Sequence, residues 1–320
     1  MSTLLHVSGL GKRFGGFVAL EGIDLDLPQG QRLGLIGPNG SGKSTFVNCV
    51  CGTLHNETGT VQFDGHNIDG LSAHERTRNG MARSFQLPRP FASLTLAENL
   101  RVPILYAVNA RTAGRIAPAA IAARCKDVLA LVGLADRAGD RVARFSGGIK
   151  RRLNIAAALI HDPDILLFDE PTVGVDPQSR NAIFDNLETL RAAGKALLYT
   201  THYLEEAERL CDRIVVMDQG RAVASDTLAG LLDQLPMAQA LTLRLSGAVV
   251  DLAALAALPG VSQPRQDGDT LRLGLTDLGR DAPVVLAWLA AQGHGLRQVA
   301  SDRAGLEDVF MALTGRQLRD

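Results

Sequence analysis

Short apolar runs alternate with helical segments along the first two thirds of the chain. Residues 31–36 (QRLGLI) and 165–168 (ILLF) are too short for helices and predict buried strands. Residues 44–50 contain no breaker before Gly52, so a helix is expected to begin near Lys43. Such alternation predicts a mainly parallel sheet covered by helices. The expected strands are residues 4–7, 18–27, 31–36, 61–63, 165–168, 196–200 and 214–217, and further helices are expected at residues 117–132, 148–160, 181–193 and 204–211.

The pattern changes after about residue 232. It predicts a small α+β unit of ferredoxin-like order, with strands at residues 240–245, 261–264, 270–275 and 296–300 and helices at residues 252–257, 283–292 and 306–313. We therefore expect two domains, residues 1–231 and 232–320, with a helical subdomain at about residues 88–162. The second domain carries no motif with assignable chemistry, which favours a packing or dimer-stabilising module over a ligand sensor.

The composition is that of a globular protein without a bulk attraction to nucleic acid. The 320 residues are 46% hydrophobic and 21% charged, and the formal net charge is −1. No run approaches the roughly 18 apolar residues that would span a bilayer, so we expect that this chain does not cross a membrane by itself. The cysteines form no C-x-x-C pair, which disfavours a zinc site and predicts reduced, mostly buried thiols at Cys49, Cys51, Cys125 and Cys211.

Residues 37–44 (GPNGSGKS) match the phosphate-binding pattern G-x-x-x-x-G-K-[ST] between a predicted strand and a predicted helix. The glycines let backbone N–H groups turn toward phosphate oxygens, and the helix presents its positive end to them. Lys43 would reach the β- and γ-phosphates, and Ser44 would bind Mg²⁺. The candidate ATP-binding residues of this loop are Gly37, Asn39, Gly40, Ser41, Gly42, Lys43, Ser44 and Thr45.

Two carboxylates, Asp169 and Glu170, follow the apolar strand at residues 165–168. The strand would deliver both to the end of the sheet, where Asp169 could hold Mg²⁺ and Glu170 could polarise an attacking water. Taken alone, a strand followed by a solvated acidic turn explains the pair equally well. Beside a phosphate loop, the metal and water roles are favoured.

Ser146, Gly147 and Gly148 come directly before another predicted helix. Free N–H groups, a hydroxyl and a helix dipole together make an anion site, although a plain helix cap with a flexible entry has the same sequence. One small domain seldom needs two anion sites for a single nucleotide. This second site is therefore expected to serve the nucleotide of another copy.

Four segments in this order and spacing resemble the motifs of ABC-type ATPases: GPNGSGKST, SGGIKRRLNIA, ILLFDEPT and TTHYLEEAE. The resemblance covers about residues 4–230. It implies an α/β fold, the P-loop NTPase ABC cassette, with a mainly parallel sheet, an antiparallel N-terminal β part and a helical subdomain. It also implies a head-to-tail dimer that sandwiches two Mg·ATP, in which Ser146, Gly147 and Gly148 of one copy contact the γ-phosphate held by Lys43 of the other.

The resemblance assigns roles to further residues. Phe14 occupies the place of the aromatic that stacks on adenine, although it could also be a core or edge aromatic. Gln86 matches the glutamine that senses Mg²⁺ and links to the membrane subunit, and Asp176 matches the loop that crosses the dimer interface. His202 matches the switch histidine that contacts the γ-phosphate. The implied catalytic residues are Glu170, His202 and Lys43, and the implied Mg²⁺ residues are Ser44, Gln86 and Asp169.

The two parts of the chain resemble different transporter classes. Residues 4–142 resemble the ATPases of branched-chain amino-acid importers, whereas the sequence from Phe145 onward resembles the ABC-2 exporter type of drug, polysaccharide and nodulation-factor transporters. The C-terminal domain favours export through a separate ABC-2 membrane subunit. Uptake by an importer and a non-transport ATPase or regulatory scaffold are the alternatives. The expected partners are a second copy or a homologous ATPase and an integral membrane subunit, with no nucleic acid, at the cytoplasmic face of the inner membrane.

Overall fold

The chain folds into two compact units, Met1–Ser225 and Asp226–Arg319. The computed structural model describes residues 2–84, 90–104, 116–235, 239–246 and 249–316. The unit boundary falls before helix α9 (Leu228–Leu232), whereas the sequence pattern placed it after residue 231. The reason is that α9 contacts α12 (Leu306–Thr314) of the second unit and buries Leu231 completely.

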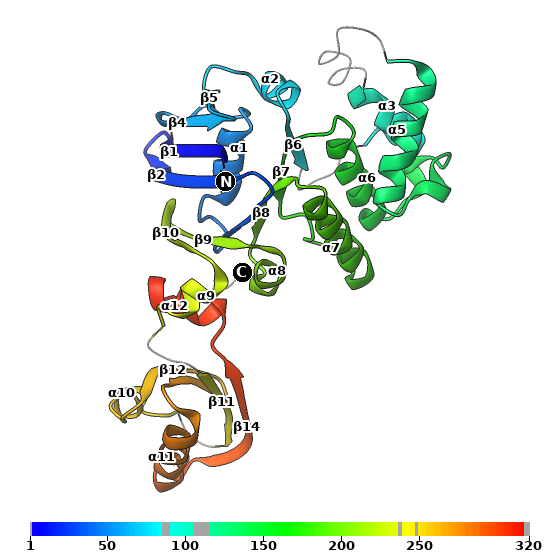
Figure 1. Cartoon of the computed structure of the whole chain (residues 1–320). Coiled ribbons are helices and arrows are strands. Elements are labelled where there is room, and N and C mark those ends of the chain that lie inside the picture. The colour runs from blue at the N-terminus through cyan, green and yellow to red at the C-terminus, as the bar shows by residue number, and fades with distance from the viewer. Residues whose placement is uncertain (1, 85–89, 105–115, 236–238, 247–248, 317–320) are drawn as a thin grey trace. The chain divides into compact units, whose positions relative to one another are not determined.

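A six-stranded sheet forms the centre of the first unit (Figure 1). Its strand order is β10-β9-β3-β8-β7-β6, and each of the pairs β3–β8, β3–β9, β7–β8 and β6–β7 is parallel. Every residue of β3 and β7 is buried, as expected for strands covered on both faces. The strands are β3 (Arg32–Ile36), β6 (Met81–Ser84), β7 (Ile165–Asp169), β8 (Ala196–Thr201), β9 (Arg213–Asp218) and β10 (Arg221–Asp226).

The two faces of this sheet bury separate hydrophobic clusters, because successive side chains of a strand point to opposite faces. Leu166 and Phe168 of β7 pack with residues of α3, α5, α6 and α7. Ile165 and Leu167 pack instead with α1 and with the N-terminal strands. The helices are α1 (Lys43–Val50), α2 (Ala73–Arg78), α3 (Leu96–Pro103), α5 (Pro118–Leu131), α6 (Gly147–Leu159), α7 (Pro177–Ala192) and α8 (Leu204–Leu210).

A second, antiparallel sheet completes the first unit in the order β2-β1-β4-β5. The predicted α/β class with an antiparallel N-terminal part is thus confirmed. Helices α3, α5 and α6, which fall within the helical subdomain expected at about residues 88–162, share one hydrophobic cluster with the central sheet. The strands are β1 (Thr3–Phe14), β2 (Phe17–Pro28), β4 (Thr58–Phe63) and β5 (His66–Asn67).

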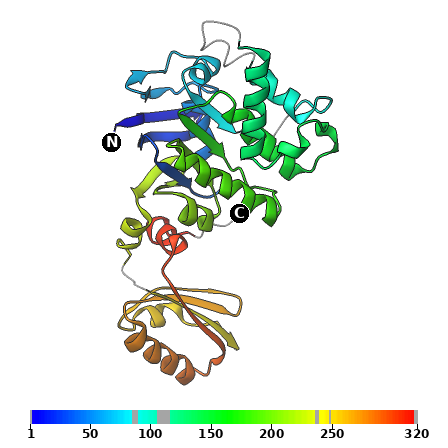
Figure 2. The ribbon, with the colours of Figure 1, turned by 45° about the vertical axis from the view of Figure 1, so that its right-hand side comes forward.

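The second unit has the predicted ferredoxin-like order. Its antiparallel sheet runs β12-β13-β11-β14, and α11 covers one face (Figure 2). Leucines at alternate positions of β11 and β13 form the core with Val285 and Leu289 of α11. The elements are β11 (Gln239–Ser246), α10 (Leu252–Ala256), β12 (Val261–Asp267), β13 (Thr270–Leu275), α11 (Leu278–Ala291) and β14 (Gly295–Arg303).

Several element boundaries differ from those predicted. Helix α11 begins at Leu278 rather than at Pro283, because Asp277 caps it by accepting the N–H of Arg280 at 2.9 Å. The sequence pattern missed α2, β6 and β10, which are short or mostly polar.

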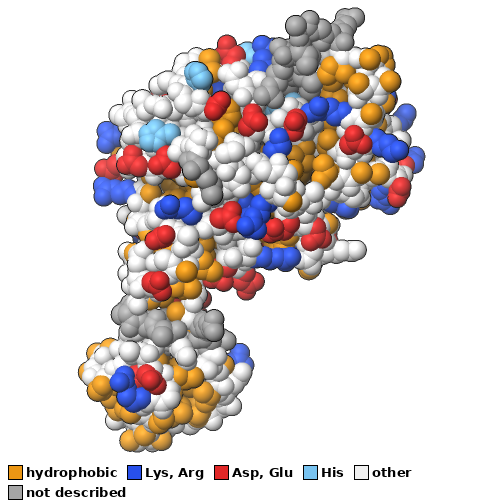
Figure 3. Space-filling view, in the orientation of Figure 1, with side chains coloured by type: hydrophobic (Ala, Val, Ile, Leu, Met, Phe, Trp, Pro, Cys, Tyr) orange, Lys and Arg blue, Asp and Glu red, His pale blue; other side chains and the backbone are white. Residues whose placement is uncertain are grey.

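Few charged side chains lie on the visible face of the second unit, whereas the first unit carries many (Figure 3).

Within the described residues, no helix combines the length and apolar character needed to cross a bilayer. The four cysteines are free thiols, and three of them are buried, as expected.

Candidate functional site

The loop between β3 and α1 adopts a conformation that requires glycine. Gly37, Gly40 and Gly42 have φ angles of 156°, 81° and 104°. A Cβ atom on Gly37 would lie 2.2 Å from the carbonyl oxygen of Met217, so a side chain there would displace the backbone. The N–H of Ser41 donates to the Pro38 carbonyl at 3.1 Å and tightens the turn. Asn39 and Gly40 are exposed, so the loop opens to solvent on its outer side.

Lys43 begins α1 and folds back over this loop. Its side chain is 4% exposed, and its ammonium donates to the carbonyls of Gly37 at 2.7 Å and Pro38 at 3.0 Å. The Nζ atom lies 3.8 Å from Glu170 Oε1. Burial lowers the pKa of Lys43, and the charges of Glu170 and Asp169 oppose this effect. The lysine charge is thus held between the loop and the carboxylates that follow β7.

Asp169 lies at the end of β7 and joins three neighbouring segments. Its Oδ1 accepts hydrogen bonds from the hydroxyls of Ser44 and Thr200, each at 3.0 Å. Its Oδ2 accepts from Arg83 of β6 at 2.7 Å. The carboxyl ends of neighbouring parallel strands meet at one edge of the sheet, where ligands bind in open α/β folds. The sequence pattern anticipated Ser44 and Asp169 but missed Arg83 and Thr200.

Glu170 is held by its backbone and faces His202. Its φ is 46°, in the left-handed region, and its N–H donates to the hydroxyl of Thr200 at 3.1 Å. Arg151 of α6 donates to the Glu170 carbonyl at 3.1 Å. The Oε1 atom of Glu170 lies 3.3 Å from Nδ1 of His202. The structure therefore brings Lys43, Glu170 and His202 together.

The Ser-Gly-Gly turn lies at the start of α6, beside the start of α7. Ser146 and Gly147 are exposed, and the side chain of Ser146 makes no capping bond to its own helix. Gly148 is buried against the start of α7. A Cβ atom at this position would lie 2.5 Å from Ser179 Oγ and 3.2 Å from Asp176 Oδ2. The glycine lets the two helix ends pack closely and leaves the N-terminus of α6 accessible.

Asp176 caps α7 by accepting the N–H of Ser179 at 2.9 Å. Hydrogen bonds from the backbone and side chain of Ser179 lower the pKa of this exposed carboxylate. Among the described residues, no hydrogen bond or ion pair joins residues 146–148 or Asp176 to residues 37–45. Within one chain, these sites remain separate.

The resemblance also named two further candidate residues, Phe14 and Gln86. Phe14 ends β1 and is 48% exposed, with Lys12 Nζ 5.6 Å from its ring centre, so it is not a core aromatic. Gln86 lies outside the described residues.

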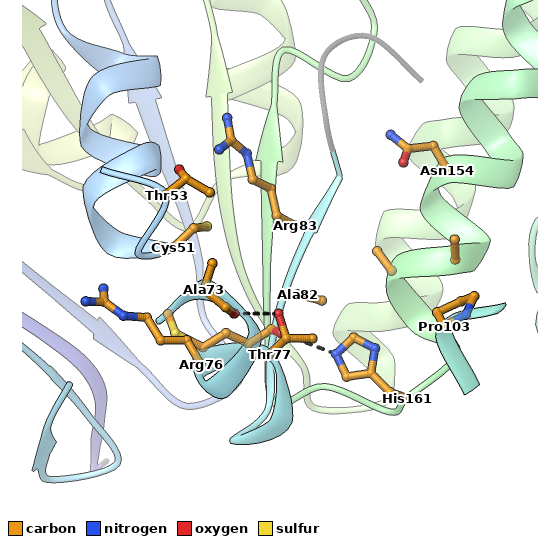
Figure 4. Close-up of a pocket in the computed structure, with 13 residues that line it drawn as sticks. Cys51, Thr53, Ala73, Arg76, Thr77, Ala82, Arg83, Pro103, Asn154 and His161 are labelled. Atoms are coloured by element: carbon orange, nitrogen blue, oxygen red, sulfur yellow. Dashed lines mark hydrogen bonds between the residues drawn. The ribbon is translucent and has the colours of Figure 1, made fainter. Parts of the chain in front are cut away.

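A cavity of about 240 Å³ lies between β6, α2 and α6 (Figure 4). Arg76 is fully buried beside it and donates to the carbonyls of Cys49 and Val50, which end α1. His161 lies 3.2 Å from the Met81 carbonyl, and Asn154 donates to Ser84. The lining residues are Cys51, Thr53, Ala73, Arg76, Thr77, Met81, Ala82, Arg83, Pro103, Asn154, Ala157, Ala158 and His161.

Known proteins resemble this chain over its whole length. The family described as ABC transporter matches residues 20–173. The linearmycin resistance ATP-binding protein LnrL of Bacillus subtilis is 35% identical over 99% of this chain and 100% of its own length. The Nod factor export ATP-binding protein I of Ralstonia nicotianae is 37% identical, over 99% of this chain and 95% of its own length.

Solved structures show the same fold for the larger part of the chain. The ADP conformation of an ATP-binding cassette of an ABC transporter superposes with a TM-score of 0.64 at 28% identity, covering 71% of this chain and 92% of that one. A dimeric cassette in a post-hydrolysis state bound to ADP and Pi gives 0.63 at 25% identity, covering 70% and 98%. The predicted resemblance is confirmed: the chain belongs to the ABC transporter ATP-binding proteins and is an ABC-type ATPase, the ATP-binding subunit of a transporter.

Proposed function

We propose that two copies of this chain, or one copy and a homologous ATPase, close head to tail around two ATP molecules and drive solute export through a separate ABC-2 type membrane subunit. The export direction is supported by relatives named for Nod factor export and linearmycin resistance, which align with nearly all of the chain. These alignments include residues 4–142, the part that resembles importer ATPases. The proposed location is the cytoplasmic face of the inner membrane, through the membrane partner.

The first unit would bind the triphosphate of ATP at the loop between β3 and α1. Lys43 and the N–H groups of residues 37–45 would hold its phosphates, and the exposed ring of Phe14 would stack on adenine. Ser44 Oγ and Asp169 Oδ1 are hard oxygen donors 3.0 Å apart, a donor set that suits Mg²⁺. When bound, Mg²⁺ neutralises charge on the phosphate oxygens. Gln86 is proposed as a third Mg²⁺ residue.

Glu170 is the proposed base for hydrolysis. Its carboxylate would orient the attacking water in line with the γ-phosphate and accept its proton. Lys43 and His202 would stabilise the charge that develops on the phosphoryl group. The contacts of Glu170 Oε1 with both residues support these roles, because three groups this close to one another could act on the same phosphoryl group.

The accessible N-terminus of α6 supports a shared nucleotide site. Ser146 and Gly147 are exposed and leave backbone N–H groups and a helix dipole free for an anion. We assign residues 146–148 and Asp176 to the ATP held by the partner copy. This arrangement makes hydrolysis depend on dimer closure, because neither copy has a complete site alone.

The cavity between β6, α2 and α6 is the proposed contact of the membrane subunit. Ala82 and Arg83, which line it, precede Gln86 closely in the sequence. A partner segment bound here would lie next to Arg83, whose guanidinium binds Asp169 at 2.7 Å. Co-purification with an ABC-2 type membrane protein supports export, whereas importer permeases with a binding protein would support uptake. A chain that hydrolyses ATP but binds no membrane protein would support the non-transport alternative.

A mixing experiment tests the shared site. Lys43→Ala and Ser146→Arg each inactivate both sites of a homodimer, so each variant alone should hydrolyse no ATP. In a mixed dimer, one site combines the intact Lys43 of one copy with the intact Ser146 of the other. Equimolar mixing should therefore restore up to about a quarter of the parental turnover. A mixture as inactive as its components would contradict the shared site.

A further inference from the structure

A buried carboxylate outside the nucleotide loop receives three hydroxyl groups. Glu206 of α8 is 4% exposed. Its Oε2 atom accepts hydrogen bonds from Thr172 at 3.0 Å, from Tyr199 at 2.9 Å and from Thr201 at 2.9 Å. A buried carboxylate is costly unless such donors satisfy it. Burial, followed by the charge of Glu206, raises the pKa of Tyr199 well above its usual value, which keeps the phenol protonated as a donor.

Two of these hydroxyls lie next to the proposed catalytic groups. Thr172 follows Glu170 by two residues, and Thr201 directly precedes His202. The Thr201 hydroxyl also accepts the N–H of Tyr203 at 2.9 Å, so it fixes the backbone on both sides of His202. Glu206 therefore ties the turn that carries Glu170 to the turn that carries His202.

Among the described residues, the second oxygen of Glu206 is connected to α7 by an ion pair and not by a hydrogen bond. Oε1 lies 3.8 Å from Nε of Arg180. The Arg180 guanidinium lies 5.2 Å from the ring centre of Tyr203, and the rings of Tyr203 and His202 are 4.1 Å apart. Arg180 is four residues beyond Asp176, the residue that caps α7. The start of α7 is thus connected to His202 through side chains only.

We propose that Glu206 is a positioning residue that sets the distance between Glu170 and His202 by binding Thr172 and Thr201. Glu206 is assigned no direct contact with ATP, and the inference rests on the catalytic roles proposed above for Glu170 and His202. A catalytic group displaced by about 1 Å can lose about 100-fold in rate, so the fixed distance has a direct consequence for turnover. Three charge-assisted hydrogen bonds supply the rigidity.

The test uses paired substitutions in the full chain. Thr201→Val removes the hydroxyl at nearly constant volume, and Thr201→Ser keeps it. We expect Thr201→Val to lower kcat about 10- to 100-fold while KM for ATP stays within about twofold, and Thr201→Ser to retain most of the parental kcat. Glu206→Gln should lower kcat about 10-fold with the same unchanged KM. Thr189→Val is the matched control, because the Thr189 hydroxyl is exposed on α7 and, within the part of the chain that the structure describes, donates to the carbonyl of Asp185 alone.

A structural role alone would lower ATP affinity, melting temperature and kcat together. If Glu206→Gln forms the ATP-dependent dimer at the same ATP concentration as the parental protein but has the lower kcat, the result supports a positioning role for Glu206. Parental kcat in both Glu206→Gln and Thr201→Val overturns the inference, as does equal loss of activity in Thr201→Ser and Thr201→Val. Parental turnover in Glu170→Gln would instead contradict the proposed function, so the two failures are distinguishable.

Discussion

Replacing Asp308 with alanine should destabilise the second unit far more than replacing its neighbour Glu307. Asp308 lies in the first turn of α12 with its side chain 5% exposed, and it accepts two hydrogen bonds from Arg272, at 2.9 and 3.3 Å. It also accepts the N–H of Gly305 at 3.0 Å, which caps the helix. Glu307 is 46% exposed, and among the described residues its one ion pair is with Arg265, at 3.0 Å.

The expected loss follows from burial. Breaking a fully buried ion pair costs about 3–5 kcal/mol, but Arg272 is 25% exposed and can turn to water, so about 2 kcal/mol is the appropriate figure. Loss of the helix cap adds about 1 kcal/mol, which makes the total about 3 kcal/mol. The exposed pair of Glu307 is worth about 0–1 kcal/mol.

Urea unfolding at pH 7 measures this difference directly. Trp288 of α11 is the only tryptophan in the chain, so its fluorescence reports the second unit alone. With an m-value of about 1–3 kcal/mol/M, Asp308→Ala should lower the midpoint by about 1–3 M urea, and Glu307→Ala should lower it by no more than about a third of that shift. Equal midpoints for the two variants would refute the reasoning that burial decides the cost.

Three further outcomes are expected. Glu170→Gln should lower ATP turnover by about 10²–10⁴-fold and leave an ATP-bound pair detectable by size exclusion, whereas the exposed Glu21→Gln should hydrolyse ATP at the parental rate. Gly37→Ala should weaken ATP binding in calorimetry more than Gly40→Ala, because a methyl group meets the Met217 carbonyl at the first position and open space at the second. Asp212→Asn should lower the stability of the protein near neutral pH. Burial raises the pKa of Asp212, but the hydrogen bonds from Arg32 and the charge of Arg32 outweigh burial, so the pKa of Asp212 is lowered. A carboxylate whose pKa is lower in the folded protein stabilises the fold at pH values above its pKa in the unfolded chain. The difference in unfolding free energy between Asp212→Asn and the parental protein should therefore be constant above about pH 5 and should shrink below pH 3.8. A difference that persists unchanged to pH 2 would contradict the role of Arg32.

Features built from contiguous residues could be predicted well. The phosphate loop depends on glycines and a lysine within eight positions, because local φ angles and one helix start define it. The ferredoxin-like order of the second unit was predicted from the succession of strand and helix patterns, in which alternating leucines mark β11 and β13 as strands. The first turn of α11 could not be predicted, since Pro283 suggested a start where the Asp277 cap had already begun the helix.

The amino-acid pattern by itself determined the fold class, the phosphate-loop motif and the two carboxylates after β7, and four of its motifs carried the resemblance to ABC-type ATPases. Only the tertiary structure decided that Arg83 binds Asp169, that Thr200 serves both Asp169 and Glu170, and that Glu206 joins the turns of Glu170 and His202. The physical reason is that the order of strands β6, β7 and β8 in the sheet, rather than spacing along the chain, brings these segments to one edge.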